Sequence, residues 1–331
     1  MAKKNSVKFT KHSIELSGQF TTALRSINSF EVFKLEIELN DGRKSFGEVV
    51  VTPAITGISA ENLFHDVKNL LIPFIEETKI VDSKDFYVNL AKLIPNNPTA
   101  RALGDLAVVN IFEEFKPSKI STDVTLPIAD SNSYQELIDE RLEAGFMVFK
   151  LKLGNADLKE NIELVEKVLR YLPQNCSLRI DPNQAWNIEY AKILLREVTS
   201  RGLELEYLEQ PIDRLDLMGL ASLKRDSSIP IMADEACFDM KDLHQIIEHE
   251  AADWINIKIL KSGGITPARE MAKVAIAAGL KVSFGCMIES PIGVKAAMKL
   301  AAEFAPEITH DLDAGWWYPQ EELIYSDGYV K

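Results

Sequence analysis

The sequence predicts an α/β protein, built as a (β/α)8-type barrel with an N-terminal α+β capping domain. Two observations predict this fold. Short apolar segments alternate with helical patterns in the second part of the chain, and charged residues follow those segments at a regular interval. Lys152, Asp181, Glu209, Asp234 and Lys258 are separated by 29, 28, 25 and 24 residues. A strand, a helix and two loops take about that many residues, so each side chain should end a strand, where such barrels carry their active sites.

Residues 1–118 are expected to form the capping domain and residues 119–331 the barrel. In the first region, alternation of apolar and polar residues predicts strands, and the last two of them are joined by Asn40-Asp41-Gly42, a hairpin signal. Helical patterns follow these strands. The expected strands cover 7–17, 30–40 and 43–52, and the expected helices 60–78, 83–94 and 98–115.

The barrel region contains eight strand-like segments and seven clear helical patterns. No GxGxxG or GxxxxGK[ST] motif follows any of these strands, so the common nucleotide-binding folds lack support. The strands are expected near 123–129, 147–153, 177–182, 205–209, 230–233, 253–258, 281–286 and 307–311. The helices are expected near 133–144, 157–171, 187–201, 213–225, 239–249, 265–278 and 290–303.

Composition narrows the class of partner. The 331 residues are 46% hydrophobic and carry a formal net charge of −13, which disfavours nucleic acid and anionic membranes. No apolar run reaches the roughly 18 residues that a membrane span needs, and the N-terminal segment does not resemble a secretory signal. The three cysteines are too few and too scattered for a disulfide framework or a zinc site. A cytoplasmic location is therefore expected.

Three of the regularly spaced side chains are carboxylates. Asp181, Glu209 and Asp234 would end the third, fourth and fifth strands, which are neighbours on one wall of the barrel. Three converging anions repel one another unless a cation lies between them, and all-oxygen ligation suits a hard divalent ion such as Mg²⁺. One such acid alone would more often be a helix cap, but repetition on adjacent strands favours a metal site. Asn183 and Glu235 lie next to the ligands and should support them by hydrogen bonds.

Two lysines flank the carboxylates. Lys150 and Lys152 are two residues apart on the second strand, so both side chains should point into the barrel mouth. Lys258 ends the sixth strand, half a barrel away, so Lys152 and Lys258 should face each other. Two bases on opposite faces of a substrate can remove a proton from one side and return one to the other. Cationic neighbours and the metal should lower their pKa values toward the working pH, as a catalytic base requires. Lys261 is assigned no role.

Five short motifs together resemble those of the enolase superfamily, in its muconate-lactonizing-enzyme subgroup. They are KLK (150–152), DPN (181–183), EQP (209–211), ADE (233–235) and NIKILKSGG (256–264). The resemblance extends over about residues 15–313. It implies an enolase-like barrel beneath a capping domain. It also implies one Mg²⁺ per subunit at the three carboxylates, with Mn²⁺ able to substitute, and Lys152 and Lys258 as the acid–base pair.

Within that subgroup the chain resembles the dipeptide epimerases, those acting on L-Ala-D/L-Glu among them. The segment HDLDAG places Asp311 and Asp313 at the end of the eighth strand, where dipeptide epimerases bind the substrate's α-ammonium group. The segment TTALRS places Arg25 where the Glu-specific members hold an arginine, whose guanidinium suits a side-chain carboxylate. Without the resemblance, Arg25 could equally be a solvated loop residue. The same correspondence assigns further substrate contacts to Thr125, Lys150, Cys286 and Ile288.

The resemblance implies a Mg²⁺-dependent dipeptide epimerase that transfers a proton between two lysines through a metal-stabilised enediolate. Its expected partner is a small dipeptide, and the sequence is compatible with a homo-oligomer. Three alternatives stay open. An o-succinylbenzoate synthase or N-acylamino acid racemase would leave Asp311 and Asp313 without an ammonium partner. A cycloisomerase would use the same barrel, and a non-catalytic barrel would bind a small acid without exchanging its α-proton.

Overall fold

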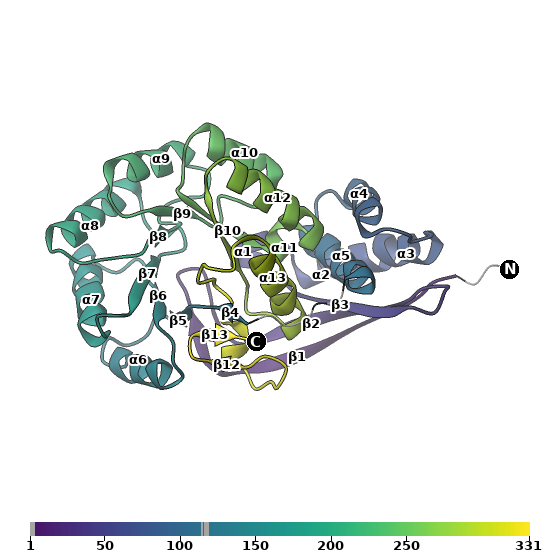
Figure 1. Ribbon diagram of the computed structural model, residues 1–331, viewed down its shortest axis with the longest axis horizontal. Coiled ribbons are helices and arrows are strands. Elements are labelled where there is room, and N and C mark those ends of the chain that lie inside the picture. Colours follow the sequence, from purple (N-terminus) through teal and green to yellow (C-terminus); the bar gives the residue numbers. More distant parts are fainter. Residues whose placement is uncertain (1–3, 114, 116–118) are drawn as a thin grey trace.

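In the computed structural model, which describes residues 4–113, 115 and 119–331, parallel strands curl into a barrel wall surrounded by helices (Figure 1). The strands lie side by side in the order β11-β10-β9-β8-β7-β6-β5. Every neighbouring pair is parallel, as expected when a helix connects consecutive strands. The predicted fold class is therefore confirmed. The strands are β5 Val124–Leu126, β6 Val148–Lys152, β7 Ser177–Asp181, β8 Leu208–Glu209, β9 Ile231–Ala233, β10 Trp254–Lys258 and β11 Lys281–Gly285.

The eighth strand predicted near 307–311 is wrong as a regular strand. That segment forms two isolated parallel bridges, which join His310 to Thr122 and Asp311 to β11. The His310 side chain interrupts the ladder, because its Nδ1 lies 3.0 Å from the Phe284 backbone nitrogen and accepts that N–H. The Asp311 N–H still donates to the Phe284 carbonyl at 3.1 Å. The barrel wall thus closes through a short irregular segment between β5 and β11.

The outer helices begin and end within a few residues of their predicted bounds. Several start at an Asp or Asn whose side chain accepts a backbone N–H of the first turn, as Asp216 accepts that of Gly219. A one-turn helix, α11, separates β10 from α12. The helices are α6 Tyr134–Glu143, α7 Leu158–Tyr171, α8 Ile188–Ser200, α9 Leu217–Asp226, α10 Met240–Glu248, α11 Ile259–Ser262, α12 Ile265–Ala277 and α13 Pro291–Phe304.

The N-terminal elements form an antiparallel three-stranded sheet with helices packed against it. The strands are β1 Ser6–Thr21, β2 Ser26–Glu38 and β3 Lys44–Val50. The helices are α1 Pro53–Thr56, α2 Ala60–Asp66, the π-helical turn η1 Val67–Leu71, α3 Ile72–Glu77, α4 Ser83–Leu93 and α5 Pro98–Phe112. The single helix predicted over 60–78 is interrupted by η1, because Pro73 lacks a backbone N–H and its ring clashes with a preceding carbonyl. Helix α5 approaches β3 closely at Gly47, where a methyl group would lie 2.7 Å from the Ala107 nitrogen.

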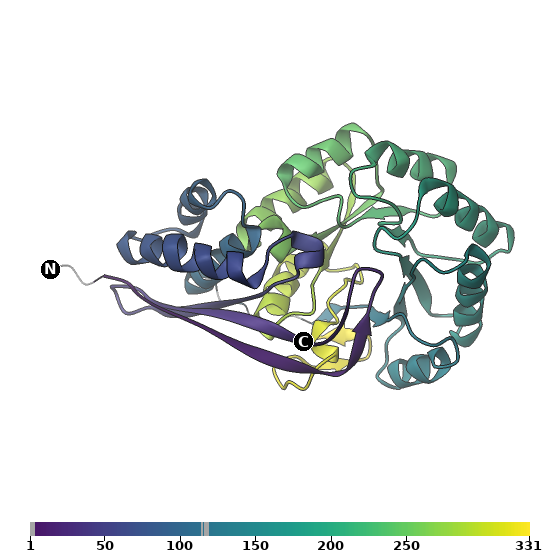
Figure 2. The same ribbon diagram turned by 180° about the vertical axis from the view of Figure 1, so that it is seen from behind.

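Contacts between the two regions position the capping sheet. The turn between β1 and β2 lies over the barrel, while the other end of this ribbon points away from it (Figure 1, Figure 2). On the other side, Asp105 of α5 is fully buried and caps α12, accepting hydrogen bonds from the Thr266 backbone N–H at 2.8 Å and hydroxyl at 2.7 Å. Residue 114, within the predicted helix 98–115, and residue 118, at the predicted domain boundary, lie outside the described residues.

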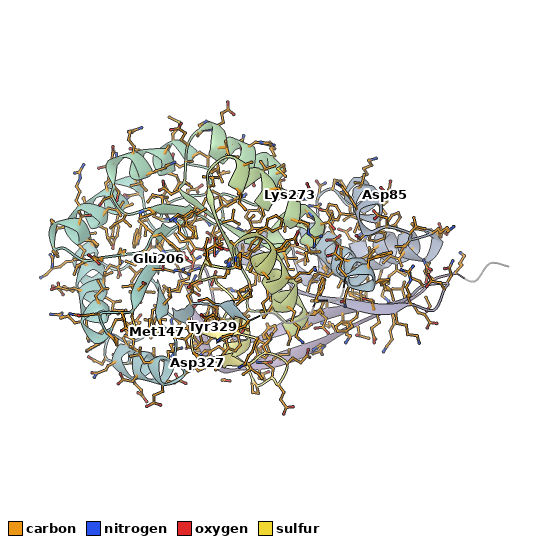
Figure 3. The ribbon with its side chains drawn as sticks, in the orientation of Figure 1. Asp85, Met147, Glu206, Lys273, Asp327 and Tyr329 are labelled. Atoms are coloured by element: carbon orange, nitrogen blue, oxygen red, sulfur yellow. The ribbon has the colours of Figure 1, made fainter. Side chains whose placement is uncertain are left out.

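The C-terminal segment returns to the start of the barrel. It contains the 3-10 turn η2 Ala314–Trp316 and the short strands β12 Tyr325–Ser326 and β13 Tyr329–Val330. Strand β13 pairs with β4, Ile120–Ser121. In the turn before β13, the Asp327 N–H donates to the Ala144 carbonyl at 3.0 Å, and Figure 3 labels Asp327, Tyr329 and Met147. Across residues 4–113, 115 and 119–331, no helix is long and apolar enough to cross a membrane.

Candidate active site

The regularly spaced charged residues converge at one end of the parallel sheet. Lys152, Asp181, Glu209 and Lys258 are the last residues of β6, β7, β8 and β10, and Asp234 directly follows β9. All five side chains are buried. Lys152 and Asp181 are cross-strand neighbours, so their side chains share one face of the sheet. Opposite Lys258 stands Gly285, where a methyl group would lie 2.7 Å from the lysine Cε. A residue without a side chain is therefore needed there.

The lysines and acids form one buried ion-pair network. Lys152 Nζ lies 2.5 Å from Asp181 Oδ2, and Lys258 Nζ lies 2.9 Å from Asp234 Oδ2. Lys150 Nζ lies between the carboxylates of Asp181 and Glu209, at 3.3 and 2.8 Å. Opposite charges thus offset one another where an isolated buried ion would be costly.

The three carboxylates lie on adjacent strands but each turns toward a lysine. Within the described part of the chain, no three His, Cys, Asp or Glu side chains are gathered closely enough to hold a metal ion. The donor chemistry nevertheless suits a hard cation, since Asp181, Glu209 and Asp234 offer only oxygen atoms. Glu209 Oε2 is buried and accepts no hydrogen bond, although it lies 2.8 Å from Lys150 Nζ. A divalent ion would thus have to replace ammonium groups as the partner of these acids.

Three further side chains support the carboxylates, and sequence reasoning missed them. Lys261 Nζ lies 2.5 Å from both Oδ1 and the carbonyl oxygen of Asp234. Asn256 donates through Nδ2 to Glu209 Oε1 at 3.0 Å. Gln210 Oε1 accepts the Asp234 backbone N–H at 3.1 Å. A sequence signal existed for Lys261, which stands three residues after Lys258 and so belongs to the same helical turn.

The two residues predicted to support the metal ligands contact them or each other. Asn183 donates through its backbone N–H to Asp181 Oδ1 at 2.9 Å and through Nδ2 to Glu235 Oε1 at 3.0 Å. Burial, and after it the charges of Asp234 and Asp181, raise the pKa of Glu235 to about 8. Asn183 Oδ1 and Glu235 Oε2 are buried without a hydrogen-bond partner. The site therefore contains buried oxygen atoms that still lack a donor or a cation.

The charge around Lys258 differs from what the sequence suggested. Burial alone would lower the pKa of Lys258, but the carboxylates of Asp234 and Asp311 outweigh burial and hold the pKa well above its usual range. Acids rather than cations are the nearest charged side chains to Lys258, so the predicted lowering of its pKa would depend on the metal ion and stays a prediction. Burial also raises the pKa of Glu209, against the opposing charge of Lys150.

A pocket connects this network to the turn between β1 and β2. Arg25 enters it from that turn and is half-buried. Within the described ranges, no side chain forms a hydrogen bond or ion pair with its guanidinium. Burial lowers the pKa of Arg25 below its usual range. The pocket is lined by Phe20, Thr22, Leu24, Arg25, Ile55, Thr125, Lys152, Asn183, Asp234, Lys258, Cys286, Met287, Ile288, Asp311 and Asp313.

The two aspartates of HDLDAG both line the pocket but have different surroundings. Asp311 Oδ2 accepts hydrogen bonds from Lys150 at 2.9 Å and from Asn256 at 3.1 Å, so Asp311 belongs to the lysine network. Asp313 Oδ2 accepts the Thr125 backbone N–H at 2.8 Å and the Trp317 indole N–H at 3.0 Å. The two predicted ammonium ligands therefore differ in their partners, since Asp311 contacts the lysine network and Asp313 contacts Thr125 and Trp317.

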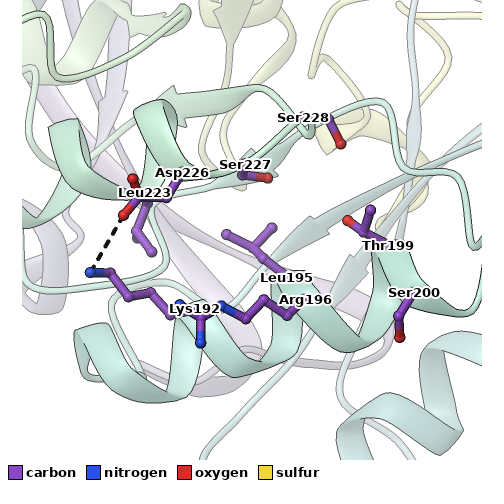
Figure 4. A pocket seen from close by; sticks show the side chains of 9 residues that line it. All are labelled: Lys192, Leu195, Arg196, Thr199, Ser200, Leu223, Asp226, Ser227 and Ser228. Atoms are coloured by element: carbon purple, nitrogen blue, oxygen red, sulfur yellow. Dashed lines mark ion pairs between the residues drawn. The ribbon is translucent and has the colours of Figure 1, made fainter.

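A second depression lies at the opposite end of the barrel strands. Figure 4 shows this groove between α8 and α9, with Lys192 and Asp226 paired at 3.6 Å. Its volume is about 380 Å³. Thr199 and Ser200 end α8, and Ser227 and Ser228 precede β9, so the groove faces the N-terminal ends of the strands. None of the catalytic candidates lies there.

Comparison with known proteins agrees with this geometry. A family model described as enolase C-terminal domain-like matches residues 133–331. The L-amino acid-D/L-Glu epimerase of Francisella philomiragia is 32% identical and aligns over 99% of this chain and 94% of its own. The N-succinyl-L-Arg/Lys racemase of Bacillus cereus is 28% identical, over 87% of this chain and 81% of its own.

Two solved structures are also similar over nearly the whole chain. The substrate-liganded L-Ala-D/L-Glu epimerase of Bacillus subtilis superposes with a TM-score of 0.93, at 26% identity, covering 99% of this chain and 96% of that one. The dipeptide epimerase of Enterococcus faecalis, complexed with Mg and L-Leu-L-Tyr, superposes with a TM-score of 0.88 at 28% identity. This superposition covers 97% of this chain and 93% of that one. The chain therefore belongs to the enolase superfamily, in the family described as enolase C-terminal domain-like.

Proposed function

We propose that this protein is a Mg²⁺-dependent dipeptide epimerase, an isomerase that acts most readily on L-Ala-D/L-Glu. The observation that carries this proposal is the placement of Asp181, Glu209 and Asp234 on adjacent strands, with Lys152 and Lys258 on the strands at either side and lining the same pocket. The names of the aligned epimerases support the reaction and the class of substrate. A cytoplasmic location and a homo-oligomeric state stay predictions.

The divalent ion is assigned to Asp181, Glu209 and Asp234. Their buried oxygen atoms fit Mg²⁺, or Mn²⁺ in its place, and the Mg complex of a similar epimerase supports the choice. When bound, the ion supplies positive charge beside the substrate carboxylate and the lysines, which makes the α-proton more acidic and lowers the lysine pKa values. Asn183 and Glu235 hold Asp181 and its surroundings in place from outside the ligand set.

Lys152 and Lys258 are assigned as the two bases. Their strands, β6 and β10, are separated by β7, β8 and β9, so the two ammonium groups approach the pocket from different parts of the wall. One neutral lysine takes the α-proton of the second residue, and the protonated lysine opposite returns a proton to the other face. The stereocentre is thereby inverted, and the reverse direction exchanges the two roles.

The substrate's two ends are assigned to opposite charges. The α-ammonium group lies beside Asp311 and Asp313, and the side-chain carboxylate of Glu lies beside the guanidinium of Arg25. The Thr125 backbone N–H and the Trp317 indole N–H both reach Asp313 through Oδ2, and the Asp313 side chain lines the pocket. Thr125, Cys286 and Ile288 also line the pocket and are assigned the remaining substrate contacts, whereas the predicted contact Lys150 is fully buried in the ion-pair network and does not line the pocket.

A second candidate is an N-acylamino acid racemase. The relative named N-succinyl-L-Arg/Lys racemase favours it, and the metal and lysine arrangement would serve both reactions. The acidic pair argues against it, because the nitrogen of an N-acyl substrate is uncharged and cannot offset Asp311 and Asp313.

The two candidates are separated by a substrate panel. Purified protein with Mg²⁺ is given L-Ala-L-Glu, L-Ala-L-Leu and N-succinyl-L-Arg, and the formation of each epimer is followed by chiral chromatography. The proposal expects L-Ala-L-Glu to give the highest kcat/KM. A higher value for N-succinyl-L-Arg would replace this proposal with the second candidate.

A further inference from the structure

Trp317 connects three parts of the candidate site. Its indole N–H donates to Asp313 Oδ2 at 3.0 Å. Its ring meets the ring of Phe20 edge to face, with centroids 4.8 Å apart and planes at 78°. Phe20 lines the pocket at the start of the turn that carries Arg25. One buried side chain therefore touches both the acidic side of the pocket and the capping turn.

The Trp317 backbone holds the same turn. Its carbonyl oxygen accepts the Ser17 N–H at 2.8 Å. Ser17 lies where the pairing of β1 with β2 changes register, between Glu15 and Phe20. The strand leaves its partner there and is bound by the C-terminal segment instead. This contact anchors the capping turn to the barrel.

The buried indole of Trp317 lies beside a surface groove and a cation. A groove of about 700 Å³ lies on one side of Trp317, lined also by Ser17, Gly18, Ile128 and Trp316. The buried guanidinium of Arg141 lies 5.4 Å from the indole ring centroid and donates to the Thr125 carbonyl at 3.2 Å. The hydrogen bond to Asp313 and the edge-to-face contact with Phe20 are therefore the two directional contacts of the indole with the candidate site.

We propose that Trp317 is a positioning residue, which orients Asp313 for the substrate's α-ammonium group and sets the capping turn over the pocket through Phe20. This inference rests on the proposed dipeptide epimerase function, in which Asp313 binds that group. Trp317 itself touches no reacting atom, and it acts through the carboxylate and the turn that do contact the substrate.

The expected kinetic signature follows from where the ammonium lies. That group keeps its charge throughout the reaction, so its contacts stabilise the bound substrate and the transition state about equally. Loss of the Trp317 N–H should therefore raise KM and leave kcat nearly unchanged. Removing one hydrogen bond to a charged group predicts a rise in KM of about tenfold or more.

The pH dependence of kcat/KM gives a second test of whether Trp317 positions Asp313. Burial and the charge of Asp311 raise the pKa of Asp313, and hydrogen bonds from Thr125 and Trp317 oppose that rise. Without the indole donor, the acidic limb of kcat/KM should move to higher pH, because the ammonium needs an ionised Asp313. The other ionisable groups that interact electrostatically with Asp313 are Asp123, Arg141, Cys286 and Tyr325, and all are unchanged in the variant.

The test compares W317F with W316F in the full-length, Mg²⁺-loaded enzyme. Trp316 is the matched control, since its ring packs against Phe146 and Tyr325 and its indole N–H donates no hydrogen bond to the described residues. W317F should raise KM for L-Ala-L-Glu about tenfold or more, with kcat within about threefold, while W316F stays near wild type. Equal KM values for the two variants would overturn the inference and leave the proposed function standing.

A double-mutant cycle separates an effect through Asp313 from a general loss of packing, because W317F keeps an aromatic ring against Phe20 and removes only the indole N–H. If Trp317 acts through Asp313, kcat/KM of the double variant W317F/D313N should be no lower than that of D313N alone. Additive losses would show a general packing role and overturn the inference. If the wild-type enzyme turns over no dipeptide, the proposed function fails on that measurement alone, and this inference fails with it.

Discussion

Asp234 is held between two buried lysines, with Lys258 Nζ 2.9 Å from Oδ2 and Lys261 Nζ 2.5 Å from Oδ1. The first lysine lines the pocket and the second does not. Lys261 also donates to the Asp234 carbonyl and to that of Asn256, so it fixes both the side chain and the backbone of this carboxylate. The lysine that sequence reasoning left without a role is thus the one that orients a proposed metal ligand.

Replacing Lys261 should therefore weaken metal binding. K261M keeps the apolar length of the side chain but leaves Asp234 without its second donor. We expect a loss of about 1–3 kcal/mol in stability and a higher Mg²⁺ concentration for half-maximal activity. Calorimetric Mg²⁺ titration and thermal unfolding measure the two effects. The exposed Lys273, paired with Glu270 on α12, provides the control variant K273M. Equal Mg²⁺ affinity and equal thermal stability of K261M and K273M would contradict a positioning role for Lys261.

Arg25 should select the second residue of the dipeptide. Its guanidinium has no partner in the described part of the chain and lines the pocket, so R25M removes a charge-assisted contact with a Glu side chain. We expect kcat/KM for L-Ala-L-Glu to fall about 10–150-fold and that for L-Ala-L-Leu to change little. R43M serves as the control, since Arg43 is exposed on the β2–β3 turn and pairs with Asp41. An unchanged preference between the two dipeptides in R25M would contradict this assignment.

Metal removal should abolish the reaction without unfolding the chain. Lysine ammonium groups lie within 3.3 Å of Asp181, Glu209 and Asp234, so we expect them to offset the charge of these carboxylates when the ion is removed. EDTA-treated protein should keep its circular dichroism and lose epimerase activity, and Mg²⁺ or Mn²⁺ should restore it. Full activity after exhaustive chelation would exclude the metal from the mechanism.

Asp105, which does not line the active-site pocket, should make the free energy of unfolding depend on pH. Burial raises its pKa from an ordinary value of 3.8 to about 7 in the folded protein. The folded state thus holds this proton more tightly, and the stabilisation is complete below about pH 4 and lost as pH rises through 7. D105N cannot lose that proton. The free energy of unfolding of wild type relative to D105N should therefore fall between pH 4 and 7, by at most about 1.4 kcal/mol per pH unit. If the difference in unfolding free energy between wild type and D105N does not change with pH, the raised pKa of Asp105 is contradicted.

The sequence predicted the parallel strands and the residues that end them because the βα repeat fixes both. Lys152 ends β6 and Asp181 ends β7 as the spacing required. Features that depend on contacts between distant segments were not predictable in the same way. His310 interrupts the eighth strand because its imidazole accepts a backbone N–H from β11. The pairing of Asp311 with Lys150 likewise joins residues 161 positions apart, and no local pattern encodes it.

The central claim is that two lysines act on opposite faces of one stereocentre, and proton exchange in D₂O tests it most directly. Wild-type protein with Mg²⁺ should incorporate deuterium at the α-carbon of the second residue of both L-Ala-L-Glu and L-Ala-D-Glu while interconverting them. K152A and K258A should each fail to epimerise, and each should retain exchange of at most one epimer, a different one in each variant. Near wild-type epimerisation by both variants, measured by NMR and chiral chromatography, would contradict the two-base mechanism.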